Sequence, residues 1–158
     1  MGKNSKSEGE KGQNIVIGEL AKLGIDICIP LSDNLPFDMI VIYECQLLRT
    51  QVKSSSYTSS GCEGSIEFSL VSNNWHKKTT KKYTTSEIDV VILCDYDKIY
   101  LLDVKDWEGR SSFTLRYESS KNKQSKNCHI AKDYIASPQR MKEVWGTIKL
   151  SCKPSEAL

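Results

Sequence analysis

The 158-residue sequence lacks the features that would place it in several large classes of protein. It has no apolar stretch of the roughly 20 residues that a transmembrane helix needs, and residues 1–6 lack the apolar core of a signal peptide. Only two histidines are present and the six cysteines form no Cys-x-x-Cys pair, which argues against a zinc site. The net charge is only +2, so total charge does not indicate a nucleic-acid partner. We expect an intracellular protein, cytoplasmic or nucleoid-associated, with reduced cysteines.

The order of the sequence patterns predicts one domain behind a polar tail. Residues 1–12 are polar and rich in glycine and lysine, and we expect them to be disordered. Residues 13–158 are long enough to fold as a single domain with its own core. Apolar patterns predict first a helix, then a series of strands, then short helices at 127–135 and 139–145. This order is typical of an α/β fold in which helices flank a mixed sheet.

Two neighbouring strands bring three chemically useful side chains together. Residues 36–53 contain two strand-like runs separated by a plausible turn at Glu44–Gln46. In the antiparallel hairpin that this pattern predicts, Asp38 lies opposite the end that carries Gln51 and Lys53. Side chains alternate along a strand, so Gln51 and Lys53 point to the same face.

These groups have the chemistry of a hydrolytic metal site. The Asp38 carboxylate, the Gln51 amide oxygen and the backbone carbonyl of Val52 are oxygen ligands of the kind that Mg²⁺ prefers. Lys53 would face an attacking water and a phosphate group. The set therefore predicts hydrolysis of a phosphodiester by a metal-bound water. Each residue type is also common on inert surfaces, so the prediction depends on their occurring together.

A fourth candidate lies on the helix that precedes the hairpin. Val16, Leu20 and Leu23 share one face at helical spacing, and Gly24 suits a C-terminal cap. Glu19 flanks this apolar face, so its carboxylate could reach the end of a sheet packed beneath the helix.

The order of Glu19 on a helix, Asp38 on a strand and the Gln51–Lys53 tripeptide on the next strand resembles the PD-(D/E)xK nuclease superfamily. Within it, the sequence looks most like the small intron-encoded homing endonucleases with a Gln-x-Lys motif, over roughly residues 12–135. The resemblance implies a restriction-endonuclease-like core. It also implies an endonuclease that acts on double-stranded DNA and uses Mg²⁺, with Mn²⁺ as a substitute.

The resemblance further implies a role for each candidate residue. Asp38 and Gln51 would bind the metal, and Lys53 would orient or activate water and steady the developing charge. Glu19 would bind a second metal or orient a metal-bound water. Gln51 stands where the superfamily usually has an acid, which leaves the site one negative charge short.

A second pattern of similar form occurs later in the chain. Asp89 is followed by Asp103-Val104-Lys105 on another apparent hairpin. No helix-borne glutamate directly precedes this copy, so we interpret it as scaffold. Asp103 and Lys105 remain the alternative site.

Two basic segments predict contacts with the DNA backbone. Residues 76–83 and 121–127 combine lysines with hydroxyl and amide side chains, which are groups that bind phosphates. Each segment could equally be a solvated loop. The candidate phosphate-binding residues are Lys77, Lys78, Lys81, Lys82, Lys121, Lys123 and Lys126.

The sequence says less about the oligomeric state of the protein and about its exact DNA substrate. Cutting both strands needs two copies of the site, so we expect a homodimer or a homotetramer. The apolar residues of segment 141–150 are candidates for the contact, or for the core. Two alternatives to a site-specific endonuclease are a nuclease that resolves Holliday junctions by their shape and an inactive DNA-binding module on the same fold.

Overall fold

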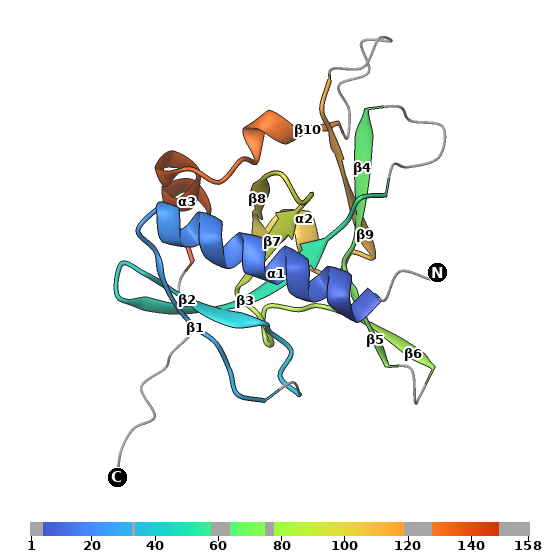
Figure 1. Ribbon diagram of the computed structural model, residues 1–158, viewed down its shortest axis with the longest axis horizontal. Helices are drawn as coiled ribbons and strands as arrows, with labels where there is room; N and C mark the ends of the chain where they lie inside the picture. The colour runs from blue at the N-terminus through green and yellow to red at the C-terminus, as the bar shows by residue number, and fades with distance from the viewer. Residues whose placement is uncertain (1–4, 33, 58–63, 75–77, 119–127, 149–158) are drawn as a thin grey trace.

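The computed structural model describes residues 5–32, 34–57, 64–74, 78–118 and 128–148 (Figure 1). Its central sheet has the strand order β1-β2-β3-β7-β8, a second sheet has the order β10-β9-β4, and β5 pairs with β6. The strands are β1 (Asp26–Cys28), β2 (Met39–Tyr43), β3 (Gln46–Ser54), β4 (Ser65–Ser69), β5 (Val71–Asn74), β6 (Thr79–Lys82), β7 (Val90–Cys94), β8 (Ile99–Leu102), β9 (Ser112–Arg116) and β10 (His129–Ile130). The helices are α1 (Ser5–Lys22), α2 (Val104–Trp107), the 3-10 helix η1 (Ala131–Asp133) and α3 (Pro138–Val144). None of the helices in the described ranges is long and apolar enough to cross a membrane.

The central sheet is mixed, as the sequence predicts. β3 runs parallel to β7, whereas the β1–β2, β2–β3 and β7–β8 pairs are antiparallel. The β2–β3 turn consists of Glu44 and Cys45, whose φ angles of 47° and 63° give the twist that a two-residue hairpin turn needs. The Asp38 amide donates to the Thr50 carbonyl at 2.9 Å, just before β2 begins. Asp38 therefore lies opposite Gln51, and the predicted hairpin is confirmed.

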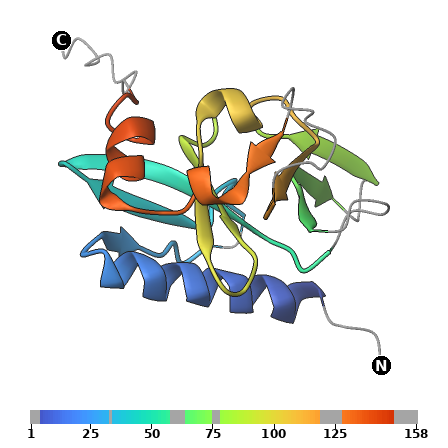
Figure 2. The same ribbon diagram turned by 90° about the horizontal axis from the view of Figure 1, so that it is seen from above.

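Apolar side chains pack on both faces of the central sheet. All five residues of β7 are buried, because both faces of the sheet are covered at this strand. Val90 and Ile92 belong to the cluster that contains Val16 of α1, whereas Val91 and Leu93 belong to the cluster formed with the second sheet and α2. Figure 2 shows α1 along one side of the central sheet and the second sheet on the other. The site-bearing strand β3 is thus held between two layers.

Helix α1 begins earlier than the sequence suggests. It starts at Ser5, so the prediction of a disordered tail is wrong for residues 5–12. The reason is tertiary: Gly12 is buried against the end of β3, and the Tyr96 hydroxyl donates to the Glu8 carbonyl at 3.3 Å. Packing of this kind stabilises helices whose composition alone would not.

Three other segments can be compared with the predictions. Segment 127–135 contains β10 and η1 in place of one helix, because β10 pairs with β9. In the basic segment, residues Thr79–Lys82 form β6 and pair with β5, so this part of the segment is not a loop. In segment 141–150, Met141, Val144 and Trp145 are buried in the core of their own chain, which is the second of the two roles considered for them.

Candidate active site

The end of the β2–β3 hairpin holds most of the predicted catalytic residues. Asp38 directly precedes β2, and Gln51, Val52 and Lys53 lie near the end of β3. The Asp38 Oδ2 atom accepts hydrogen bonds from the Gln51 Nε2 atom at 2.6 Å and from the Val52 amide at 2.8 Å. All four residues line one open cavity of about 460 Å³.

The polar atoms beside Asp38 are arranged to suit a cation. The Gln51 Nε2 atom lies 2.6 Å from Asp38 Oδ2 and 3.2 Å from the Val52 carbonyl oxygen. Two oxygens from the two arms of the hairpin therefore converge on one electropositive amide group. A half-turn of the Gln51 amide would present its Oε1 atom instead, and three oxygens would then face one point. Such a set fits the ligand preference of Mg²⁺.

The burial of Asp38 makes a positive partner important. Burial raises the pKa of the Asp38 carboxyl, whereas the Val52 amide, the Lys53 charge and the Gln51 amide act in the opposite direction. A cation beside the carboxylate would also favour its ionised form. Nowhere in the described ranges do three His, Cys, Asp or Glu side chains converge as metal ligands. A metal at Asp38 would therefore depend on the neutral oxygens of Gln51 and Val52.

Lys53 is fixed by contacts outside the hairpin. Its Nζ atom donates to the Val71 carbonyl at 2.9 Å and lies 4.9 Å from the centroid of the Tyr83 ring. Burial lowers the pKa of Lys53, and the Asp38 charge opposes this effect. Burial, together with the Asp38 charge, raises the pKa of Tyr83 to about 12, so the phenol stays neutral. An acceptor and an aromatic face thus hold the ammonium group at the cavity.

Glu19 does not reach this cavity. Its carboxylate forms an ion pair with Lys22 at 2.7 Å and is absent from the cavity lining. The residues of α1 that line the cavity include Glu8 and Gln13, and the Gln13 Nε2 atom donates to the Asp38 carbonyl at 3.3 Å. Six residues of helix, or roughly 9 Å, separate Gln13 from Glu19. The predicted helix therefore does reach the site, but through Gln13 and not through Glu19.

The sequence contains a pattern that indicates which end of α1 lies at the cavity. Gly12, Val16 and Leu20 recur every four residues, and all three are buried. A Cβ atom at Gly12 would lie 2.5 Å from the Cβ atom of Ser54, so only glycine permits this approach to the end of β3. Because glycine has no apolar side chain, the buried face of the helix looks shorter than it is. Extending that face to Gly12 brings Gln13 to the cavity.

We expect Gly12→Ala to reduce cleavage activity without the gain in stability that alanine usually gives in a helix. Alanine is favoured over glycine by about 1 kcal/mol in a helix interior. At position 12, however, the new methyl group would push α1 away from Ser54. The matched control is Gly18→Ala, where no atom lies within 4 Å and the full stabilisation is expected. Urea unfolding and cleavage assays on both variants test this, and equal stabilisation by both would contradict the close approach.

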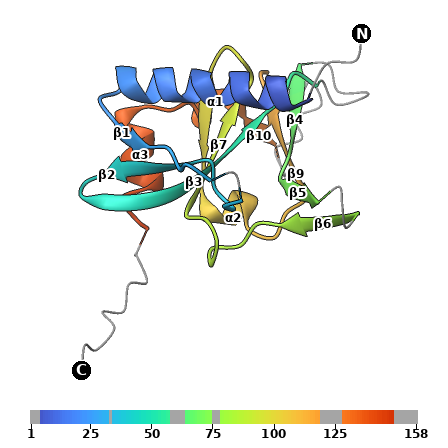
Figure 3. The ribbon, with the colours of Figure 1, turned by 60° about the horizontal axis from the view of Figure 1, so that its bottom comes forward.

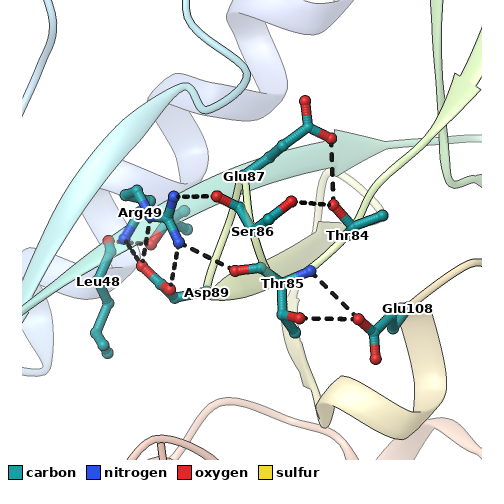
Figure 4. Close-up of polar contacts among 9 residues, drawn as sticks. Leu48, Arg49, Thr84, Thr85, Ser86, Glu87, Asp89 and Glu108 are labelled. Atoms are coloured by element: carbon teal, nitrogen blue, oxygen red, sulfur yellow. Dashed lines mark hydrogen bonds and ion pairs between the residues drawn. The ribbon is translucent and has the colours of Figure 1, made fainter. Parts of the chain in front are cut away.

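The second Asp-containing pattern forms no comparable site. Asp89 accepts hydrogen bonds from the Arg49 amide at 2.8 Å, from Nε at 3.0 Å and from Nη2 at 2.9 Å. Arg49 also donates to the Ser86 and Thr85 carbonyls at 2.8 and 3.1 Å (Figure 4). The Thr85 hydroxyl in turn donates to Glu108 at 2.8 Å. Asp89 thus anchors β3 to the segment before β7, which is a structural role.

Asp103 and Lys105 lie at the start of α2. Asp103 is the N-cap residue of this helix and Lys105 is its second residue. Their side chains form an exposed ion pair at 3.5 Å. The alternative site predicted from the sequence therefore consists of a surface ion pair, apart from the Asp38 cavity.

Three of the predicted DNA-binding lysines lie in the described ranges. Lys78, Lys81 and Lys82 are exposed on β6 or just before it. Lys81 forms an ion pair with Glu87. The predictions for Lys77, Lys121, Lys123 and Lys126 fall outside the described residues.

A mixed sheet covered by a helix, with an aspartate and a Gln-x-Lys tripeptide at one end, defines a protein of the PD-(D/E)xK class. The chain belongs to the PD-(D/E)XK endonuclease family, whose sequence model matches residues 3–137. Its fold is similar to that of a bacterial homing endonuclease, I-Ssp6803I, with a TM-score of 0.60 and 22% sequence identity. That similarity covers 85% of this chain and 88% of the other. No curated protein matches the chain. The superfamily and the α/β fold expected from the sequence are confirmed.

Proposed function

We propose that the protein is a Mg²⁺-dependent endonuclease that cuts double-stranded DNA at specific sites by hydrolysing phosphodiester bonds. The observation that carries the proposal is the convergence of Asp38 Oδ2 and the Val52 carbonyl on the Gln51 amide. The Lys53 ammonium lines the same cavity. Membership of an endonuclease family supports the reaction class.

Each residue of the site has a distinct proposed role. Asp38, the Val52 carbonyl and the rotated Gln51 amide would hold the ion, which would supply Lewis-acid charge at the phosphate. Lys53 would orient the attacking water and stabilise the negative charge that develops on the phosphate, because only one of its three N–H donors is used by Val71. Glu19 takes no part in this proposal, since Lys22 binds its carboxylate.

We also propose that the protein acts as a homodimer or homotetramer. Each chain contributes one Asp38 cavity, and a break in both DNA strands needs two. A symmetric pair of protomers would favour a roughly palindromic target.

Cleavage of random-sequence duplexes and of four-way junctions tests these proposals together. With Mg²⁺ or Mn²⁺, we expect a subset of duplex sequences to be cut in both strands. With Ca²⁺ we expect no cutting, because Ca²⁺ accepts looser and more variable ligand geometry. Native and denaturing gels separate double-strand breaks from nicks.

Other outcomes of this experiment would contradict the proposal in specific ways. Cutting of junctions but not of duplexes would favour a structure-specific nuclease. Binding without cutting under any metal would favour an inactive DNA-binding module. Nicks alone would contradict the paired arrangement of sites.

A further inference from the structure

Strands β5 and β6 form a small sheet separate from the other two. Each pairs only with the other among the described strands. This two-stranded unit, which we call the ribbon, projects from the body of the molecule beyond β4 and β9 (Figure 1, Figure 3). All four residues of β6 are exposed. A pair of strands with so little packing suits a partner outside the chain better than a role in the core.

The base of the ribbon is attached to the proposed active site. The first pair of the ribbon joins Val71 to Lys82, and the Val71 carbonyl accepts the hydrogen bond from Lys53. Tyr83, which directly follows β6, places its ring against the Lys53 ammonium. The position of the ribbon is therefore fixed relative to Lys53.

The two faces of the ribbon differ in their contacts. Residues opposite each other in an antiparallel pair share a face. Ser72 and Lys81 form one such pair, and both contact the body of the molecule: Lys81 binds Glu87, and Ser72 forms a hydrogen bond with Tyr83. This is the inner face of the ribbon.

The opposite, outer face carries Asn73, Thr80 and Lys82. Asn73 is paired with Thr80 in the register, and the Thr80 hydroxyl donates to the Asn73 Oδ1 atom at 3.4 Å. All three side chains are exposed, and no ion pair between described residues involves Lys82. The outer face thus offers an amide, a hydroxyl and an ammonium group to a partner.

These groups fit the edges of base pairs. The major groove of B-DNA admits a two-stranded ribbon, where asparagine and threonine can bind base edges and lysine can bind guanine or phosphate. The Lys82 ammonium on this face complements the negative charge of the duplex. We infer that the outer face of the ribbon reads base edges in the major groove at a fixed distance from the cleaved phosphate. The inference rests on the proposed function.

The geometry sets that distance. Asn73 and Thr80 lie two residues beyond the pair that is attached to Lys53. Two residues of extended strand span roughly 7 Å, which corresponds to about two base pairs of duplex. For a ribbon that lies along the groove, the bases that it reads should therefore lie about two base pairs from the cut.

A selection of bound duplexes tests the inference without requiring cleavage. The full chain and its variants are incubated with a random-sequence duplex library in Ca²⁺, and the bound fraction is sequenced. Thr80→Val and Asn73→Ala change the outer face. The matched control is Thr79→Val, which makes the same substitution one residue away, on the inner face.

We expect the wild-type chain and Thr79→Val to enrich the same sequences. Thr80→Val and Asn73→Ala should each lose about tenfold in preference at one or two adjacent positions, as expected for one lost base contact. Unchanged preferences in both outer-face variants would overturn the inference, as would an equal change in Thr79→Val.

Cleavage of the same library in Mg²⁺ separates this inference from the proposed function. Cutting without base preference would overturn the inference and leave the nuclease proposal standing. Ribbon-dependent binding without cutting would support base reading and overturn the nuclease proposal. Altered base preferences that lie a full helical turn from the cut would overturn the fixed distance.

Discussion

Asp38→Asn should abolish cleavage while leaving DNA binding intact or stronger. The substitution removes the carboxylate on which the proposed metal site depends, and metal ions contribute several kcal/mol to such reactions. A loss of several kcal/mol lowers the rate by roughly three orders of magnitude. Binding should persist because one negative charge that repels phosphate is removed. Cleavage with Mg²⁺ and gel-shift assays measure the two effects separately.

The asparagine is well suited to this test because it conserves the shape of the site. Its side-chain oxygen can still accept the hydrogen bond from the Val52 amide, which Asp38 accepts at 2.8 Å. The matched control is Glu19→Gln, which makes the same change of acid to amide on α1. Glu19 forms an ion pair with exposed Lys22 and does not line the Asp38 cavity, so activity should be retained. Wild-type rates in Asp38→Asn would contradict the proposed metal site.

The sequence correctly brings together the site residues that lie close to one another in the chain, on a single hairpin. Asp38 directly precedes β2 and Gln51 lies in β3, and a two-residue turn joins these strands, so the register of the two residues follows from the turn itself. Alternation then places Gln51 and Lys53 on the same face. A short hairpin therefore carries enough information to bring the main residues together.

The part that the sequence does not predict depends on contacts between distant segments. Gln13 reaches Asp38 only because Gly12 lets α1 pack against the end of β3. Likewise, Lys53 is held by Val71 and Tyr83, which belong to segments that no short motif links to the hairpin. Such contacts depend on tertiary packing, which the periodicity of a single sequence does not predict.

The second Asp-x-Lys pattern shows why a motif needs its structural context. Asp89 and Asp103 occur on a hairpin of the predicted type, since β7 and β8 are antiparallel. The Arg49 guanidinium nevertheless binds Asp89, and the chain turns into α2 directly after Asp103. A sequence pattern shows which residue types are present. It does not show which other side chains bind them in the folded protein.

Lys53→Ala should reduce cleavage by about a hundredfold or more, whereas Lys105→Ala should leave it within about twofold. Loss of one positioned donor to a developing negative charge typically costs two to three orders of magnitude, but loss of an exposed ion pair has little effect. Lys53 is held between the Val71 carbonyl and the Tyr83 ring, whereas Lys105 extends into solvent.

The two lysines differ in burial, so the comparison needs a variant that separates chemistry from packing. Lys53→Met keeps an unbranched apolar chain against the Tyr83 ring and removes only the charge and its donors. If Lys53 acts chemically, Lys53→Met should be as inactive as Lys53→Ala while unfolding closer to the wild-type temperature. Single-turnover rates at saturating Mg²⁺, measured beside thermal unfolding, provide both readouts. Restored activity in Lys53→Met would reduce Lys53 to a packing residue, and loss of activity in Lys105→Ala alone would move the site to the β7–β8 hairpin.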